Sequence, residues 1–141
     1  MLGNAEVGME KIVADETLKK KILVADDDAE IRSLVSDVLS DLGYLVVTVS
    51  DGAMLYRSVP SEKPDLILSD LDMPGLSGGT AQALLRTSPE TKDIPIIFMT
   101  GQSPERQARL VEFRPDTRIL YKPLNLKELA IAVEEELNPS F

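Results

Sequence analysis

The stretch "LILSDLDMPGLSGG", residues 66–79, joins a run of apolar residues directly to two acidic residues, Asp70 and Asp72, and then to a Pro-Gly turn. A short apolar run that is bounded by turn residues is typical of a strand buried on both faces of a parallel sheet. We therefore predict a strand at Asp65–Ser69 that ends at Asp70. A strand of this kind would hold the Asp70 carboxylate rigidly at the edge of the sheet.

Similar apolar runs occur on both sides of this stretch, and amphipathic segments separate them. In those segments, apolar residues recur at spacings of three and four, which is the pattern of a helix with one buried face. The predicted strands are Ile22–Ala25, Tyr44–Val49, Asp65–Ser69, Ile94–Met99 and Arg118–Tyr121. The predicted helices are Ile31–Leu42 with Asp28 as its N-cap, Gly52–Val59 before Pro60, Gly78–Thr87, Ser103–Phe113 and Leu126–Leu137.

Five short strands that alternate with helices predict an α/β fold with a five-stranded parallel sheet covered on both faces. Right-handed crossovers make such a sheet doubly wound. The 141 residues suit one domain, which we place at 21–138, with an N-terminal extension at 1–20 and a C-terminal tail at 139–141. In folds of this class, ligands bind beyond the carboxyl ends of the strands.

Composition excludes several kinds of chemistry. The chain has no Cys, which excludes disulfides, thiolate nucleophiles and Cys zinc sites. It has no His either, which excludes a Ser-His-Asp triad, His-ligated metals and a role as a phosphohistidine carrier. The formal charge of −9 argues against a direct nucleic-acid partner. No apolar run approaches the roughly 18 residues of a membrane span, and no signal peptide is evident, so we expect a cytoplasmic protein without a membrane partner.

Polar residues stand where four of the predicted strands end. They are Asp26 and Asp27 after the first strand, Asp70 and Asp72 after the third, Thr100 after the fourth and Lys122 after the fifth. Since the carboxyl ends of parallel strands meet at one edge, we expect these side chains to lie together.

A cluster of carboxylates needs positive charge. At an effective dielectric constant of about 20, two unit charges about 4 Å apart repel by roughly 4 kcal/mol. A hard divalent cation relieves that repulsion, so we expect Mg²⁺, with Mn²⁺ as an alternative. A metal, the Lys122 amine and the Thr100 hydroxyl around one aspartate form a site for a phosphoryl group, and that aspartate can become an acyl phosphate.

Four motifs in this order resemble the receiver domain of two-component response regulators, in particular single-domain receivers of the chemotaxis type. They are "ILVADDD" (22–28), "DLILSDLDMPGLSG" (65–78), "IIFMTG" (96–101) and "YKPL" (121–124). The resemblance implies a flavodoxin-like (βα)5 fold and a signalling switch that assists its own phosphorylation and dephosphorylation, rather than an enzyme. The implied phosphoryl donor is a sensor histidine kinase or a phosphotransfer protein. The implied output is contact with a downstream protein, by a monomer or weak dimer.

The resemblance also implies roles for single residues. Asp70 matches the phosphoryl acceptor, and Asp26 and Asp27 match the acidic pair that binds Mg²⁺. Asp72 stands where the family uses a backbone carbonyl as a metal ligand. Thr100 matches the switch hydroxyl, and Lys122 matches the lysine that pairs with the phosphoryl group, ahead of a cis bond to Pro123. Ile119 departs from the pattern, because many receivers have an aromatic switch residue there.

Two other functions fit parts of the pattern. The segment "LILSDLD" (66–72) also resembles the opening motif of haloacid-dehalogenase-type phosphatases. Those enzymes, however, have a second acidic pair after their lysine, whereas here Asp26 and Asp27 precede every other motif. A pseudo-receiver that binds a partner without phosphorylation is the third hypothesis, and the intact set of acids argues against it.

Overall fold

The computed structural model describes residues 18–73, 75–101 and 117–139. Within these ranges the chain forms one parallel sheet of five strands in the order β2-β1-β3-β4-β5. The strands are β1 (Lys21–Ala25), β2 (Leu45–Val49), β3 (Leu66–Asp70), β4 (Ile96–Thr100) and β5 (Arg118–Tyr121). The predicted five-stranded parallel sheet is therefore confirmed. The helix predicted at Ser103–Phe113 lies outside the described residues, as do residues 1–17 of the predicted extension and residues 140–141 of the predicted tail.

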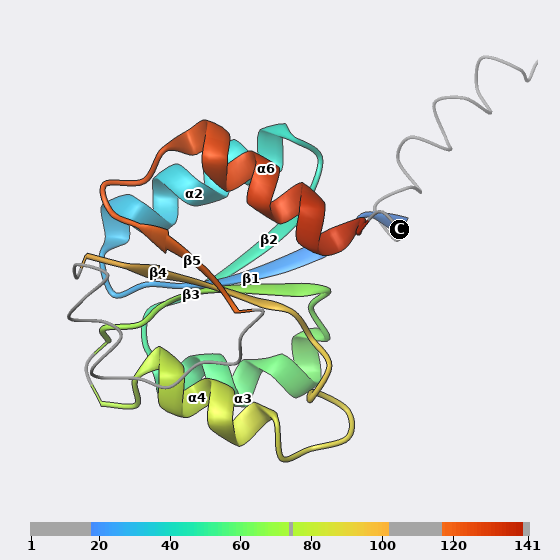
Figure 1. Cartoon of the computed structure of the whole chain (residues 1–141). Helices are drawn as coiled ribbons and strands as arrows, with labels where there is room; N and C mark the ends of the chain where they lie inside the picture. The colour runs from blue at the N-terminus through green and yellow to red at the C-terminus, as the bar shows by residue number, and fades with distance from the viewer. Residues whose placement is uncertain (1–17, 74, 102–116, 140–141) are drawn as a thin grey trace, which may run out of the picture.

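Helices cover both faces of this sheet (Figure 1). Helices α2 (Ala29–Asp41) and α6 (Leu126–Leu137) lie on one face, and α3 (Gly52–Glu62) and α4 (Gly78–Leu85) lie on the other. The chain passes from β1 to its neighbour β2 on one side and then returns past β1 to β3 on the other. This reversal makes the sheet doubly wound and brings the loops after β1 and β3 side by side.

Alternation along the strands divides the core into two layers. In β1, Leu23 and Ala25 pack in the cluster that includes residues of α3 and α4, whereas Ile22 and Val24 pack in the cluster with residues of α2 and α6. All five residues of β3 are buried, because this strand lies in the middle of the sheet. Burying a Leu, Ile or Val side chain contributes about 1.5–3 kcal/mol, so the central strands are firmly anchored.

Each described helix begins with a side-chain cap. The N-cap side chains of Asp28, Asp51, Ser77 and Asn125 accept hydrogen bonds from backbone N–H groups of α2, α3, α4 and α6. A cap of this kind stabilises a helix by about 1 kcal/mol. The predicted cap at Asp28 is confirmed, and the four caps fix where the chain enters each helix after leaving the sheet edge.

Several boundaries differ by one to three residues from the sequence-based prediction; among them, β4 begins at Ile96 rather than Ile94, and α4 ends at Leu85 rather than Thr87. Helix α3 continues through Pro60 to Glu62 instead of ending at Val59. Pro60 lies in the last turn, where its missing N–H removes a single helical hydrogen bond, and the Lys63 N–H then closes the helix on the Val59 carbonyl at 2.9 Å. Strands β3 and β4 also include Asp70 and Thr100 as their final residues, so the sheet itself holds both side chains.

Candidate functional site

Three carboxylates meet at the carboxyl edge of the sheet. Asp26 and Asp27 follow β1, and Asp70 ends the neighbouring β3. Each offers an oxygen, and these oxygens all lie within 4.8 Å of one another. Asp26 and Asp70 are buried, with 0% and 3% of their surface exposed, whereas Asp27 is exposed to solvent. The structure therefore brings together the three acids that the sequence places at two strand ends.

Lys122 supplies a positive charge to this cluster. Its Nζ donates to Asp26 Oδ2 at 2.8 Å and to Asp70 Oδ2 at 3.3 Å. The Lys122 backbone N–H donates to the Thr100 carbonyl at 2.7 Å, which ties the loop after β5 to the end of β4. The bond from Lys122 to Pro123 is cis, as expected. One ammonium group thus bridges two buried carboxylates at the carboxyl ends of different strands.

Backbone N–H groups hold the other oxygen of each buried carboxylate. The Asp28 N–H donates to Asp26 Oδ1 at 2.9 Å, and the Asp72 N–H donates to Asp70 Oδ1 at 3.0 Å. Hydrogen bonds to a charged acceptor are stronger than those between neutral groups. Asp26 and Asp70 are therefore fixed in orientation as well as in position.

The surroundings of Asp70 make its carboxyl group harder to ionise than a free aspartate. Burial raises the pKa of Asp70 to about 6, and the nearby Asp26 charge adds to this rise, although the Asp72 N–H and Lys122 oppose it. Burial lowers the pKa of Lys122, but the hydrogen bond to Asp26 and the charges of Asp70 and Asp26 outweigh burial, so the pKa is raised overall. Three acids against one amine leave a net negative charge at this edge.

Thr100 and Asp72 contact each other beside Asp70. The Thr100 side chain is buried with 0% exposure, and its Oγ1 donates to Asp72 Oδ2 at 3.2 Å. Asp72 is exposed and lies on the loop after β3. The resemblance to receiver domains implies a metal-binding role only for the Asp72 backbone carbonyl, and it does not predict this side-chain contact. The only sequence signal for this contact is that β3 and β4 are neighbours, which places the residues after β3 near the end of β4.

The cluster suits a hard divalent cation. Its donors are carboxylate oxygens, which Mg²⁺ and Mn²⁺ prefer, and their negative charge exceeds what Lys122 compensates. Asp26, Asp27 and Asp70 are the residues that would hold such an ion.

Arg32 supports the loop that carries the acidic pair. It lies on α2, and its Nη1 donates to the Asp26 carbonyl oxygen at 2.7 Å. The contact spans six residues and fastens the β1–α2 loop to the helix that follows it. No role for Arg32 follows from the sequence, because helical periodicity places an arginine on a face without specifying its hydrogen-bond partner.

Gly52 allows two loops at this edge to approach closely. It begins α3, and a Cβ atom built at Gly52 would lie 1.7 Å from the backbone oxygen of Leu76. Leu76 belongs to the β3–α4 loop, which also carries Asp72. No side chain fits between these backbones, so Gly52 is required for the present path of the loop.

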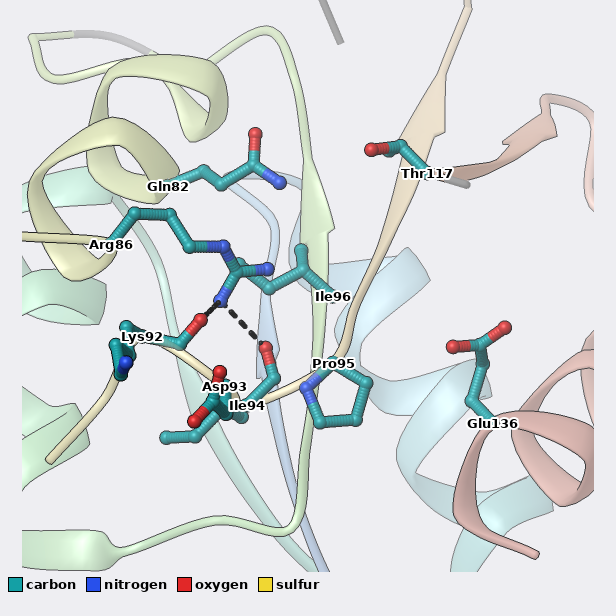
Figure 2. A pocket seen from close by; sticks show the side chains of 9 residues that line it. All are labelled: Gln82, Arg86, Lys92, Asp93, Ile94, Pro95, Ile96, Thr117 and Glu136. Carbon is teal, nitrogen blue, oxygen red and sulfur yellow. Dashed lines mark hydrogen bonds between the residues drawn. The ribbon is translucent and has the colours of Figure 1, made fainter. Parts of the chain in front are cut away.

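The opposite edge of the sheet has a different character (Figure 2). A hollow of about 170 Å³ lies near the start of β4, and Arg86 and Pro95 are among the residues that line it. Arg86 Nη1 donates to the carbonyl oxygens of Lys92 at 2.7 Å and Ile94 at 2.9 Å. These bonds satisfy two backbone carbonyls of the α4–β4 connection.

Ile119, which departs from the receiver pattern, is half-buried and packs against the core cluster on the α3 and α4 side of the sheet.

In the part of the chain that the structure describes, no helix combines the length and apolar character needed to cross a membrane.

Comparison with known proteins gives a consistent result. A family model described as "Response regulator receiver domain" matches residues 22–134. The CAI-1 autoinducer sensor kinase/phosphatase CqsS of Vibrio cholerae is 36% identical over 106 residues, which cover 74% of this chain and 16% of that protein. The probable transcriptional regulator ycf27 of Guillardia theta is 36% identical over 126 residues, which cover 87% of this chain and 47% of that protein.

The chain thus spans less than half the length of these two curated relatives. A solved structure, the chemotaxis response regulator CheY4 of Vibrio cholerae, is similar over nearly its whole length. It shares 31% identity with a TM-score of 0.73, covering 84% of this chain and 99% of that chain. The predicted flavodoxin-like receiver fold is confirmed by this similarity.

Proposed function

Because the chain belongs to the response regulator receiver domain family, we propose that Asp70 accepts a phosphoryl group and that this switches the protein between two conformations. The observation that supports the proposal is the meeting of Asp26, Asp70 and Lys122 at one edge, with two buried carboxylates bridged by one amine. Receiver domains are signalling switches rather than classical enzymes. The change of charge at Asp70 is the signal here.

In the proposed reaction, an oxygen of the Asp70 carboxylate attacks the phosphorus of a phosphohistidine. A new P–O bond forms, the P–N bond breaks, and the histidine nitrogen leaves with the electron pair. The Asp72 N–H orients the Asp70 carboxylate, to whose Oδ1 it donates at 3.0 Å. Mg²⁺, or Mn²⁺ in its place, would be held by Asp26, Asp27, Asp70 and the Asp72 carbonyl, and when bound it supplies positive charge that favours phosphoryl transfer.

Lys122 has a second role after the transfer. Asp70 loses its carboxylate charge when it becomes an acyl phosphate, and the phosphoryl oxygens carry new negative charge nearby. The Lys122 ammonium group, which now lies 3.3 Å from Asp70 Oδ2, can follow that charge while it keeps its 2.8 Å bond to Asp26. Charge-assisted bonds of this kind stabilise the phosphorylated state.

The phosphoryl donor that we propose is a sensor histidine kinase or a phosphotransfer protein. The output is contact with a downstream protein, and we expect neither direct binding of nucleic acid nor a membrane partner. The overall charge of −9 supports the exclusion of nucleic acid. A cytoplasmic location and a monomer or weak dimer complete the proposal.

Intact-mass measurement tests the assignment of Asp70. The protein is incubated with acetyl phosphate and Mg²⁺, and we expect a single phosphate-sized gain in mass that is lost in Asp70→Asn. The matched control is Asp93→Asn, which makes the same substitution at an exposed aspartate near the amino end of β4 and should leave labelling unchanged.

Each other hypothesis predicts a different result. A wild-type protein that never gains mass would favour a pseudo-receiver. Sustained release of phosphate from p-nitrophenyl phosphate would favour a phosphatase of the haloacid-dehalogenase type. Labelling that persists in Asp70→Asn would overturn the choice of acceptor.

A further inference from the structure

We propose that the carboxylate of Asp72 restrains the switch by holding the Thr100 hydroxyl in the unphosphorylated protein, so that a phosphoryl group on Asp70 must compete with Asp72 for that hydroxyl. The inference rests on the proposed function and concerns the regulation of the same site. It gives the Asp72 side chain a role separate from that of its backbone carbonyl.

The geometry joins Asp72 to both partners in the switch. Its backbone N–H donates to Asp70 Oδ1 at 3.0 Å, and its side-chain Oδ2 accepts from Thr100 Oγ1 at 3.2 Å. Thr100 is the last residue of β4, paired in the sheet with β5, and has no exposed surface. The hydroxyl is therefore held between a rigid strand and an exposed acid on a loop.

The chemistry of the hydroxyl makes the two contacts exclusive. A threonine hydroxyl has one hydrogen to donate. Both the Asp72 carboxylate and a phosphoryl group on Asp70 are anionic acceptors, and neither can donate to the other. Thr100 must consequently give up its bond to Asp72 before it donates to the phosphoryl group, and the free energy of that bond is subtracted from the stability of the switched state.

Asp72 also stands apart from the metal-binding acids. Among the described residues, Asp26, Asp27 and Asp70 form the group whose carboxylate oxygens all lie within 4.8 Å of one another. The Asp72 side chain instead accepts the hydrogen bond from the Thr100 hydroxyl. Its carboxylate is therefore available to act on the hydroxyl rather than on the cation.

The test measures binding of beryllium trifluoride, a mimic of an acyl phosphate on aspartate, in the presence of Mg²⁺. We expect Asp72→Ala to lower the half-saturating concentration about three- to tenfold, which is the range for one hydrogen bond of ordinary net strength. Removing a negative charge at this edge changes binding as well, so a double-mutant cycle is needed.

The second member of the cycle is Thr100→Val, which replaces the buried hydroxyl by a methyl group of similar size and keeps the strand packed. In the Thr100→Val background, Asp72→Ala should change the half-saturating concentration only through the loss of one negative charge. In a Thr100→Ser background, which retains the hydroxyl, Asp72→Ala should again have most of its effect on beryllium trifluoride binding. Equal effects of Asp72→Ala with and without the Thr100 hydroxyl would overturn the proposal.

A direct measurement uses the methyl resonance of Thr100 in threonine-labelled protein, assigned by its absence in Thr100→Val. In Asp72→Ala without beryllium trifluoride, this resonance should move toward its position in the ligand-bound wild type. An unmoved resonance would contradict the inference. Failure of the proposed function is distinct, because then the wild type would not bind beryllium trifluoride, or Asp70→Asn would bind it equally well.

Discussion

At the amino edge of the sheet, the basic side chains of Lys21 and Arg86 are bonded to nearby carbonyls and one glutamate, whereas at the carboxyl edge Lys122 faces two buried carboxylates. Lys21 Nζ donates to the carbonyl and Oε1 of Glu62, and Arg86 donates to two carbonyls of the α4–β4 connection. Lys122 instead bridges Asp26 and Asp70 and leaves negative charge in excess. Among the described residues, the group at the carboxyl edge combines three acids with one amine, and this leaves negative charge that a ligand can balance.

The largest expected effect comes from Lys122→Met, which removes the amine between Asp26 and Asp70. Without metal, the free energy of unfolding should fall by about 3 kcal/mol, because two buried carboxylates lose their counter-charge. Mg²⁺ should then stabilise the variant more than the wild type, since the cation no longer competes with an ammonium group. Urea unfolding of both proteins, with EDTA and with saturating Mg²⁺, measures this difference.

The control for that experiment is Arg86→Met at the amino edge. It removes two hydrogen bonds to backbone carbonyls and should lower the free energy of unfolding by about 2 kcal/mol. Because Arg86 lies far from the acids, the loss should be the same with EDTA and with Mg²⁺. If Mg²⁺ restores the unfolding free energy of both variants equally, the proposed difference between the two edges is wrong.

Acidification should have a smaller effect on the free energy of unfolding, and the raised pKa of Asp70 fixes its sign. The pKa of Asp70 is raised to about 6 from 3.8, so between these values the folded protein binds a proton that the unfolded chain does not. Protonation of Asp70 therefore adds to the free energy of unfolding. This added stability is complete below pH 3.8 and is lost as the pH rises to about 6. In EDTA, this contribution should amount to about 1–2 kcal/mol.

Comparison with Asp70→Asn isolates this term from the other carboxylates, because the amide does not titrate. The difference in unfolding free energy between the two proteins should change across this pH window and stay constant above it. If the difference in unfolding free energy does not change with pH, the pKa of Asp70 is not raised in the folded protein.

The smallest effect is expected for Arg32→Met. Loss of the 2.7 Å bond to the Asp26 carbonyl should loosen the β1–α2 loop and weaken Mg²⁺ binding about three- to tenfold. Isothermal titration with Mg²⁺ measures the affinity. The melting temperature in EDTA should change little, and Arg32→Lys should recover part of the affinity. A drop in melting temperature without a change in affinity would assign Arg32 to the fold alone.

Much of the site follows from the sequence because it depends on strand ends. Apolar runs that stop at Asp26, Asp70 and Thr100 predict a parallel sheet, and a parallel sheet brings its carboxyl ends to one edge. The position of Lys122 after the last strand follows in the same way. This inference needs only the period of the pattern and the direction of the chain.

The remaining features depend on side-chain conformations and on contacts between loops, which periodicity does not encode. The Asp72 carboxylate contacts Thr100, 28 positions along the chain, and the Arg32 guanidinium contacts a backbone carbonyl. The continuation of α3 through Pro60 has a similar cause, because the Lys63 cap that closes the helix is a local conformation with φ of 50°. The roles assigned to Asp26, Asp27, Asp70, Asp72, Thr100 and Lys122 stay predictions until the phosphorylation experiments are done.

The near contact between Gly52 and the Leu76 carbonyl has an evolutionary consequence. A larger residue at position 52 can enter only if the loop around residue 76 takes another path, since the obstacle is backbone and cannot rotate aside. Mutations in these two segments should therefore be accepted in pairs during divergence of the chain. Anyone grafting the β3–α4 loop from a related protein should transplant the start of α3 along with it.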